Sequence, residues 1–497
     1  MADCIIIAGG MYQHNHYPRI MRSLGPYRIA SALENEGFDA KVIDFTQYLT
    51  IDEIITAVSK VLTPDTLWVG FSSTFFWGWS DDRKQRLYPH IQYSDVLKLF
   101  SFIRERSKAK LVYAGVRSIN ENDDEIDCYI QGYADTSTIE YTKYLKHDDI
   151  SFINNKHHIS SNGKSMVIVS KDYEEPKMDN IRTHWWREDF NVLPDESLPL
   201  EMARGCIFKC KFCGYGLLGK KKGTYLRDIE EVREDLIRTW EATGCTNYYI
   251  VDDTFNDDND KVENIHKLFT SLPFKIKFSA YLRIDLINKF PHQADLLKEM
   301  GLVGNFFGIE SLHYPSAKAI GKGLHPNKVK DRLYWLKEKW GDDVRMGAGF
   351  ILGLPYDTLE YFDELEKWIL EKDNPLSFVE IYPLRLLGKI MTKRNPNASQ
   401  FNMNPEIYGY EVDDVTNFWT LDSQGLDYAK CLKLADEMYK KRHPFNKPAD
   451  FAIQQYLSMG LSVEQVNDTF DNLSAKYMFD NVNDFKLNQY KQMIGAI

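Results

Sequence analysis

Short apolar segments alternate with helix-like segments along most of this chain of 497 residues. Apolar runs of about four to eight residues bounded by turn residues are typical of buried strands, and apolar residues spaced three or four apart are typical of helices. Strands and helices that alternate along a sequence form parallel sheets covered by helices. The pattern therefore predicts an α/β protein.

The first part of the chain in which expected strands and helices alternate is residues 1–148. Its expected strands are 4–10, 39–45, 67–73, 110–116 and 126–132, the last being the final strand, and its expected helices are 19–38, 51–62 and 94–107. This order predicts a Rossmann-like, doubly wound parallel sheet, in which ligands bind at the carboxyl ends of the strands. Residues 149–195 have weak periodicity and are predicted to be a linker containing a lone strand at 165–170.

The second segment is residues 196–390. Its expected strands are 200–204, 246–253, 275–283, 303–310, 344–353 and 377–384. Six strand–helix units are fewer than the eight of a closed barrel, so we expect a partial (β/α)6, TIM-like barrel with its active site at the carboxyl ends of the strands. Residues 391–497 are expected to be a mostly helical C-terminal region, with helices at 426–442 and 448–460.

Composition narrows the class of protein. The net charge of −11 disfavours a partner such as bulk nucleic acid, which is usually bound by a basic face. No apolar run reaches the roughly 18 residues of a membrane helix, and the N-terminus has no secretory signal pattern. Seven cysteines are too few for a disulfide scaffold. We therefore expect a cytoplasmic protein with no membrane partner.

Three of the cysteines form a cluster, Cys206-x3-Cys210-x2-Cys213, directly after the first expected barrel strand. Structural zinc normally takes four ligands, and no fourth Cys or His lies close in sequence. Thiolates also ligate iron–sulfur clusters, and three of them leave one iron of a four-iron cluster open. Gly205 and Gly214 permit tight turns here, and three basic side chains can offset the thiolate charge: Arg204, Lys209 and Lys211.

The spacing of these cysteines, with Phe212 before the third, resembles the radical S-adenosylmethionine (radical SAM) superfamily. The resemblance implies a [4Fe–4S] cluster on Cys206, Cys210 and Cys213. It also implies that the open iron chelates SAM, which is cleaved reductively to a 5′-deoxyadenosyl radical. An external one-electron reductant of the flavodoxin or ferredoxin type is implied as a partner.

Further motifs in the barrel segment resemble the same family. They are IVDDTFND (250–257), SAYLRID (279–285), NFFGIESLH with IGKG (305–323) and GFILGLPYDT (349–358). The resemblance implies contacts to SAM or substrate from Phe212, Asp253, Arg283, Glu310, Gly353 and Pro355. Tyr356 and Asp357 depart from the usual Gly-Glu of the last motif, and a plain turn or a structural salt bridge is the alternative for several of these positions.

Residues 24–45, 70–74, 114–116 and 130–135 resemble, in this order, the cobalamin (B12)-binding domains that precede some radical SAM barrels. The usual D-x-H-x-x-G motif is missing, and the corresponding loop carries His14 and His16 at another spacing. Methylthiotransferases of the superfamily carry a second three-cysteine site in their N-terminal domain. Only Cys4 and Cys128 occur in residues 1–195, which excludes such a site.

The function predicted from the sequence is that of a cobalamin-dependent radical SAM enzyme, of methyltransferase type, that transfers a methyl group to, or rearranges, an unactivated centre. Two alternatives stay open: a cobalamin-independent radical SAM enzyme acting on a small molecule or peptide, and a zinc-binding interaction protein. The sequence does not identify the substrate. For Trp419 and the Asn- and Tyr-rich stretch 397–420, packing is the alternative to a role in capping the barrel.

Overall fold

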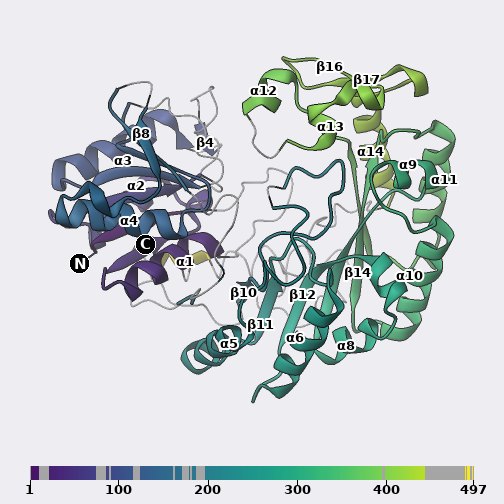
Figure 1. Ribbon diagram of the computed structural model, residues 1–497, viewed down its shortest axis with the longest axis horizontal. Helices are drawn as coiled ribbons and strands as arrows, with labels where there is room; N and C mark the ends of the chain where they lie inside the picture. Colours follow the sequence, from purple (N-terminus) through teal and green to yellow (C-terminus); the bar gives the residue numbers. More distant parts are fainter. Residues whose placement is uncertain are drawn as a thin grey trace.

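The computed structural model describes most of the chain. The described residues are 2–9, 22–73, 86–88, 91–115, 124–160, 163–170, 178, 182–185, 196–215, 217–394, 398–442, 487–488, 490–492 and 495. They form two α/β domains that lie side by side, with a smaller C-terminal region above the second (Figure 1). None of the helices in these described parts is long and apolar enough to cross a membrane.

The N-terminal domain contains a seven-stranded sheet in the order β2-β1-β3-β6-β7-β9-β8. Its strands are β1 (Cys4–Ile7), β2 (Ala40–Ile43), β3 (Trp68–Ser72), β6 (Lys110–Gly115), β7 (Cys128–Gln131), β8 (Lys156–Ile159) and β9 (Met166–Val169). All neighbours are parallel except β8, which is antiparallel to β9. The first five strands have the flavodoxin-like order of a doubly wound sheet, which confirms the predicted fold class.

Helices cover both faces of this sheet. They are α1 (Leu24–Asn35), α2 (Ile51–Val61), α3 (Tyr93–Arg106) and α4 (Asp135–His147). Alternate residues of β1 enter two different cores, with Cys4 and Ile6 on the side of α1 and α4 and Ile5 and Ile7 on the side of α2 and α3. A short antiparallel pair, β4 (Arg86–Tyr88) and β5 (Ile91–Gln92), precedes α3.

The predictions that 126–132 is the final strand and that 165–170 is a lone strand are wrong. Strand β9 pairs in parallel with β7, and α4 is the crossover between them. The buried face of α4 consists of Ser137, Thr138, Tyr141 and Thr142, so it lacks the apolar periodicity by which helices are recognised. The sheet thus includes part of the segment predicted to be a linker. The boundaries at 148, 195 and 390 stay predictions.

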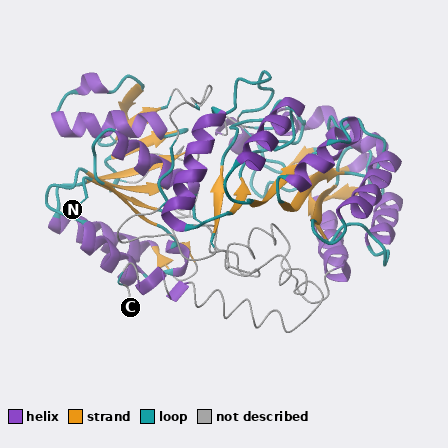
Figure 2. Ribbon diagram, turned by 90° about the horizontal axis from the view of Figure 1, so that it is seen from below, coloured by secondary structure: helices purple, strands orange, loops and turns teal. Residues whose placement is uncertain are grey.

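The second domain is an open barrel of six parallel strands in sequence order. They are β10 (Ser197–Leu200), β11 (Asn247–Ile250), β12 (Lys277–Leu282), β13 (Leu302–Glu310), β14 (Arg345–Leu352) and β15 (Phe378–Pro383). The helices outside them are α5 (Ile229–Thr243), α6 (Asn259–Ser271), α7 (Ile284–Lys289), α8 (Gln293–Glu299), α9 (Tyr314–Ala319), α10 (Pro326–Trp340) and α11 (Leu359–Ile369). Figure 2 shows these helices around the strands. The partial barrel is therefore confirmed.

The described part of the C-terminal region is less helical than predicted. It contains α12 (Lys389–Arg394), α13 (Gln400–Met403), β16 (Glu411–Val412), β17 (Trp419–Leu421), β18 (Leu426–Asp427) and α14 (Tyr428–Arg442). The three short strands form an antiparallel sheet that the sequence did not indicate. The expected helix at 426–442 is α14, and the one expected at 448–460 lies outside the described residues.

The two domains share one continuous apolar core where α1 meets β10, the edge strand of the barrel. Tyr27 and Leu33 of α1 belong to the same buried cluster as Leu198 and Leu200 of β10. At the start of β10, the guanidinium of Arg22 forms two hydrogen bonds with Glu196, at 2.7 and 3.1 Å, and donates a third to the Tyr27 hydroxyl at 2.7 Å. Both charged side chains are almost fully buried, so the junction is fixed by apolar packing and by a buried ion pair.

We predict that Arg22→Met destabilises the protein by about 3 kcal/mol or more, because it leaves the carboxylate of Glu196 buried without its cation. Urea unfolding followed by circular dichroism measures this difference. The matched control is Arg104→Met, which removes an exposed arginine of the same domain and is expected to change stability by less than about 0.5 kcal/mol. Equal midpoints for the two variants would contradict the role given to the buried pair.

Candidate functional site

The segment that carries the three cysteines begins where β10 leaves the sheet. The backbone N–H groups of Met202 and Ala203 donate to Oδ1 of Asp252 at 2.8 and 2.9 Å, so this carboxylate takes the place of a neighbouring strand. Lys261, itself buried, holds Asp252 through an ion pair of 2.8 Å. Strand β10 therefore ends at Leu200, earlier than the predicted 200–204.

Gly205 makes the turn into the cysteine cluster. Its φ of +116° lies in the region that favours glycine, and a Cβ atom there would lie 2.7 Å from the carbonyl oxygen of Leu217. The backbone N–H of Cys206 donates to the same carbonyl at 2.9 Å. Only glycine at 205 lets the chain pass this close, which fixes the direction in which Cys206 enters the site.

The three cysteines line one cavity of about 190 Å³ at the carboxyl ends of the barrel strands. Four other residues predicted from the sequence line the same cavity, namely Phe212, Asp253, Arg283 and Glu310. The cavity also contains residues that the sequence reasoning did not single out, namely Phe208, Thr254, Tyr281, Phe306 and Lys322. All of these except Phe208 lie inside the barrel motifs that the sequence analysis quotes, so the motifs, without the individual residues, were the visible signal.

The arrangement of the thiols fits an iron–sulfur cluster better than a zinc ion. Burial raises the pKa of Cys206 and raises that of Cys213 to about 12, so both sulfurs keep their protons until a metal displaces them. In the described part of the chain, no three His, Cys, Asp or Glu side chains converge on a point that one metal ion could fill. Three thiols that line one cavity match an iron–sulfur cluster, in which each thiolate binds a different iron.

Arg283 supplies positive charge beside the thiols. Its Nη1 donates to Sγ of Cys210 at 3.5 Å, and its guanidinium lies 3.7 Å from the ring centre of Phe208. Asp285 holds the other edge of the guanidinium with bonds of 3.0 and 2.6 Å. Arg283 is therefore fixed in a position where it can stabilise a thiolate.

The three basic residues expected to offset the thiolate charge contact other groups. Arg204 bonds to Asp135 and Glu201, and the ammonium of Lys211 lies 5.5 Å from the ring centre of Tyr408. The aliphatic part of Lys209 packs beside Gly219. That prediction is corrected, since the sequence does not show which of several cations the fold turns toward the sulfurs.

Two carboxylates face the cavity. Burial, together with the neighbouring charge of Asp252, raises the pKa of Asp253 to about 6. Burial also raises the pKa of Glu310, whose carboxylate lies 3.6 Å from the ammonium of Lys322. Glu310 has a φ of +68° at a register shift of β13, and Lys322 also donates to the carbonyl of Gly308. A cation and an anion thus lie together at the end of this strand.

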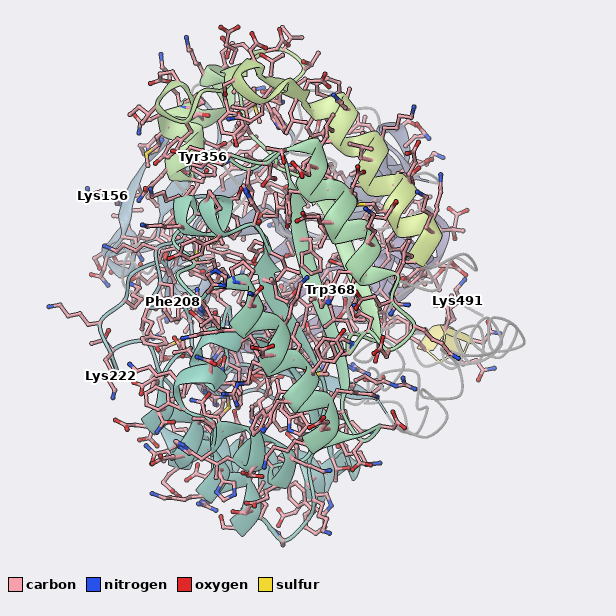
Figure 3. The ribbon with its side chains drawn as sticks, turned by 90° about the vertical axis from the view of Figure 1, so that its right-hand side faces the viewer. Lys156, Phe208, Lys222, Tyr356, Trp368 and Lys491 are labelled. Atoms are coloured by element: carbon pink, nitrogen blue, oxygen red, sulfur yellow. The ribbon has the colours of Figure 1, made fainter. Side chains whose placement is uncertain are left out.

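Gly353 and Pro355 do not line this cavity. Their turn is closed by Asp357, whose carboxylate accepts hydrogen bonds from the backbone of Gly353 and Leu354 at 3.0 and 2.9 Å and from Ser316 at 2.6 Å. A Cβ on Gly353 would lie 2.2 Å from the ring of Trp419. A role for this turn in binding a cofactor stays a prediction. The neighbouring Tyr356 is exposed (Figure 3).

Part of the C-terminal region packs against the cysteine loop. The backbone N–H of Phe401 donates to the carbonyl of Lys211 at 3.2 Å. Trp419 is buried and donates to the carbonyl of Leu384 at 2.7 Å. Trp419 therefore has the packing role considered as an alternative, while residues around 401 help to hold the loop.

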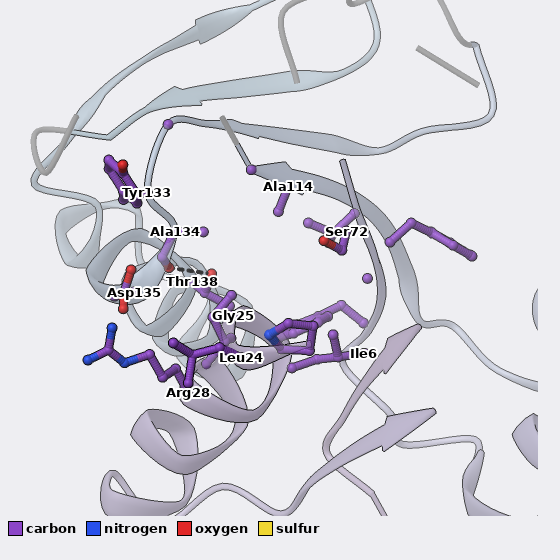
Figure 4. A pocket seen from close by; sticks show the side chains of 18 of the residues that line it. Ile6, Leu24, Gly25, Arg28, Ser72, Ala114, Tyr133, Ala134, Asp135 and Thr138 are labelled. Carbon is purple, nitrogen blue, oxygen red and sulfur yellow. Dashed lines mark hydrogen bonds between the residues drawn. The ribbon is translucent and has the colours of Figure 1, made fainter. Parts of the chain in front are cut away.

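A second cavity, of about 250 Å³, lies in the N-terminal domain at the carboxyl ends of β1, β3, β6 and β7 (Figure 4). Small residues make up much of its lining, and they are Gly25, Gly70, Ser72, Ala114, Gly115, Gly132 and Ala134. It lies at the switch point of the sheet, where doubly wound folds bind their ligands. The segments predicted to resemble a cobalamin-binding domain meet here, whereas His14 and His16 lie outside the described residues.

The second cavity reaches the barrel. Glu201 and Arg204, which lie between β10 and Cys206, are part of its lining. Arg28 of α1 forms an ion pair with Glu201, and Arg204 forms one with Asp135 at 3.2 Å. The two cavities are therefore separated along the chain by no more than the turn at Gly205.

Fold and site together define a two-domain α/β protein with a three-thiol site at the mouth of a partial barrel and a ligand pocket on the adjoining sheet. Residues 200–369 match the sequence model of the radical SAM superfamily. The chain thus contains a radical SAM domain, as the cysteine spacing indicated.

Two curated relatives are methyltransferases by name. Over 172 residues, the chain is 29% identical to an uncharacterized methyltransferase of Pyrococcus horikoshii. This match covers 34% of this chain and 36% of that protein. Over 280 residues the chain is 24% identical to the bacteriochlorophyllide d C-8(2)-methyltransferase of Chlorobaculum tepidum. This match covers 53% of this chain and 58% of that protein. The chain therefore spans only about one third to three fifths of the length of these relatives.

Solved structures share the fold over most of the chain. The radical SAM methyltransferase TsrM of Kitasatospora setae, solved with tryptophan and a SAM analogue, has a TM-score of 0.60 at 14% identity, covering 82% of this chain and 77% of that one. The cobalamin-dependent SAM radical enzyme OxsB, solved with aqua-cobalamin and SAM, has a TM-score of 0.55 at 16% identity. The match covers 82% of this chain and 56% of the OxsB chain.

We predict that the pH dependence of stability is set in part by Asp357. Burial raises its pKa from 3.8 to about 7, so the folded state binds the proton more tightly than the unfolded state does. Its contribution to the free energy of unfolding therefore falls as pH rises from about 4 to about 7. Asp357→Asn, which keeps an acceptor oxygen, removes this dependence. Urea unfolding at pH 5 and pH 8 is expected to show the wild type losing a few kcal/mol relative to the variant. A constant difference would contradict the assignment.

Proposed function

We propose that this protein is a cobalamin-dependent radical SAM enzyme that transfers a methyl group to, or rearranges, an unactivated centre of a small-molecule or peptide substrate. The observation that carries the proposal is the cavity in which Cys206, Cys210 and Cys213 meet Arg283 and Glu310 at the carboxyl ends of the barrel strands. The radical SAM domain over residues 200–369 and the methyltransferase names of its relatives support it.

In this proposal the three cysteines hold a [4Fe–4S] cluster with one open iron. When bound, such a cluster supplies the electron that cleaves SAM, and cobalamin supplies a carrier for the methyl group. The chain provides a largely shielded site whose thiols would lose their protons to solvent as the sulfurs ligate the cluster irons. Arg283 stabilises the sulfur of Cys210 by charge and by a hydrogen bond. An external one-electron reductant is the partner that this chemistry requires.

Glu310 and Lys322 are proposed to bind the polar end of SAM. The methionine part of SAM carries an amino group, which can donate a hydrogen bond to Glu310, and a carboxylate, which can pair with Lys322. The side chains are 15% and 14% exposed, so both are accessible from the cavity while largely shielded from water. The rings of Phe208, Tyr281 and Phe306 surround the same space and exclude water from a reactive radical.

The pocket of the N-terminal domain is proposed to bind cobalamin. Its apolar, glycine-rich lining fits a flat group such as the base of the nucleotide tail, and its position at the strand ends is that of ligands in doubly wound sheets. A Cβ on Gly115 would lie 2.4 Å from Oγ of Ser73, so the narrow wall of the pocket depends on glycine there.

Anaerobic reconstitution with iron and sulfide, with and without hydroxocobalamin, tests the proposal. We expect four irons per chain and a bound corrin spectrum in the wild type. The single variants Cys206→Ala, Cys210→Ala and Cys213→Ala are expected to lose most of the iron while keeping the corrin. Cys245→Ala is the matched control, since this cysteine is buried like Cys206 but lies outside the cavity.

Other results separate the alternatives. One zinc per chain without sulfide would overturn the enzyme and favour the zinc-binding interaction protein. Four irons together with cleavage of SAM but no bound corrin would favour the cobalamin-independent radical SAM enzyme. Full iron content in all three cysteine variants would rule out the assigned ligands.

A further inference from the structure

One arginine lines the N-terminal pocket and lies, in the sequence, beside the cysteine cavity. Arg204 lines the pocket of the N-terminal domain, and it is two residues before Cys206. Its guanidinium bonds to Asp135 at 3.2 and 3.4 Å and to Glu201 at 3.0 and 3.2 Å, and it lies 4.7 Å from the ring centre of Tyr133. Only 8% of the residue is exposed. Every nitrogen of this side chain is thus bound to a carboxylate.

The partners of Arg204 belong to the wall of the pocket. Asp135 is the first residue of α4, and Tyr133 lies in the turn between β7 and α4. Both line the cavity, and Figure 4 shows Asp135 and Arg28 at the same end of it. A ligand that fills the cavity therefore restricts this turn, and the turn holds Arg204.

Arg204 is joined through its backbone to the loop that carries the three cysteines. The backbone N–H of Arg204 donates to the carbonyl of Tyr225 at 3.0 Å, and the strained turn at Gly205 follows immediately. Between residues 204 and 206 the chain passes close to the carbonyl oxygen of Leu217, which would lie 2.7 Å from a Cβ on Gly205, so the backbone has little room to move there. The pocket wall is thus linked to Cys206 by the bidentate ion pair between Asp135 and Arg204 and by the backbone from residue 204 to residue 206.

We infer that Arg204 is a positioning residue that couples the two sites, so that cobalamin binding in the N-terminal pocket and cluster assembly on the three cysteines strengthen each other. The inference rests on the proposed function. Coupling between two sites is reciprocal, and typical values change an affinity by about 5- to 150-fold. Arg28 and Glu201 supply the supporting ion pair from α1, which keeps the carboxylate of Glu201 facing Arg204.

The test is a titration with hydroxocobalamin of two forms of the full chain, the apoprotein and the cluster-reconstituted protein, under anaerobic conditions. Trp68 lines the pocket, so quenching of its fluorescence reports occupancy independently of enzyme activity. Subtraction of the signal of Trp68→Phe isolates this tryptophan. In the wild type we expect the cluster to tighten binding about tenfold. In Arg204→Met the two dissociation constants are expected to become equal, with the iron content still measurable.

Asp135→Asn provides a second route to the same result, since it removes the charge on the other side of the ion pair. The double variant with Arg204→Met is expected to show no further loss of coupling. Arg104→Met is the matched control and keeps the tenfold ratio, since its ion pair with Asp127 lies outside the pocket lining. Circular dichroism verifies that each variant is folded.

Three outcomes overturn the inference: equal affinities in the wild-type forms, an unchanged ratio in Asp135→Asn, or an unchanged ratio in a folded Arg204→Met. Each of them leaves the proposed function standing, because both cofactors still bind. Failure of the proposed function looks different: no quenching at any concentration shows that the pocket does not take cobalamin, and absence of iron after reconstitution shows that the cysteines hold no cluster.

Discussion

The contact between α1 and the edge strand β10 determines the arrangement of the rest of the molecule. An edge strand leaves one row of backbone groups and one flank of side chains without a neighbouring strand. Here that flank is covered by a helix of the other domain, and Tyr27 and Leu198 share one apolar core. Ion pairs close the contact at both ends, between Arg22 and Glu196 at the start of the strand and between Arg28 and Glu201 after it. The two sheets are consequently held in one relative orientation.

This orientation explains how two cavities on separate domains come to be neighbours. The cysteine loop leaves the carboxyl end of β10, and the pocket of the first domain opens at the carboxyl ends of β1, β3, β6 and β7. Because α1 lines that pocket and also packs on β10, the same helix positions both sites. In the proposed function, a methyl group carried on a corrin and a radical generated at an iron–sulfur cluster have to reach one substrate atom, and neighbouring cavities suit that requirement.

Much of the fold could be predicted from the sequence, because the strands of both sheets are apolar runs bounded by turns. The exceptions have physical reasons. Helix α4 buries Ser137 and Thr138 instead of aliphatic residues, so it was missed, and the strand expected at 165–170 was not placed in the sheet as β9. The end of β10 was placed too late because a buried carboxylate, Asp252, substitutes for a neighbouring strand beyond Leu200. Neither effect has a periodic signature in the chain.

The site was predictable where a motif carries it and not where it depends on tertiary contacts. The cysteine spacing singled out the three cysteines, and Arg283 and Glu310, also predicted, line the same cavity. The pairing of Arg204 with Asp135 joins residues 69 positions apart, and that of Arg22 with Glu196 joins residues 174 positions apart. Single-sequence reasoning cannot choose such partners among the 61 basic and 72 acidic residues of the chain.

The central claim is that the corrin and the cluster occupy facing sites across one junction. Electron paramagnetic resonance tests it directly, because cob(II)alamin and a reduced [4Fe–4S] cluster each carry an unpaired electron. We expect the protein loaded with both to show dipolar broadening and faster relaxation of the cobalt signal than the protein loaded with cobalamin alone. A spectrum equal to the sum of the two separate signals, from protein shown to contain both groups, would contradict the account.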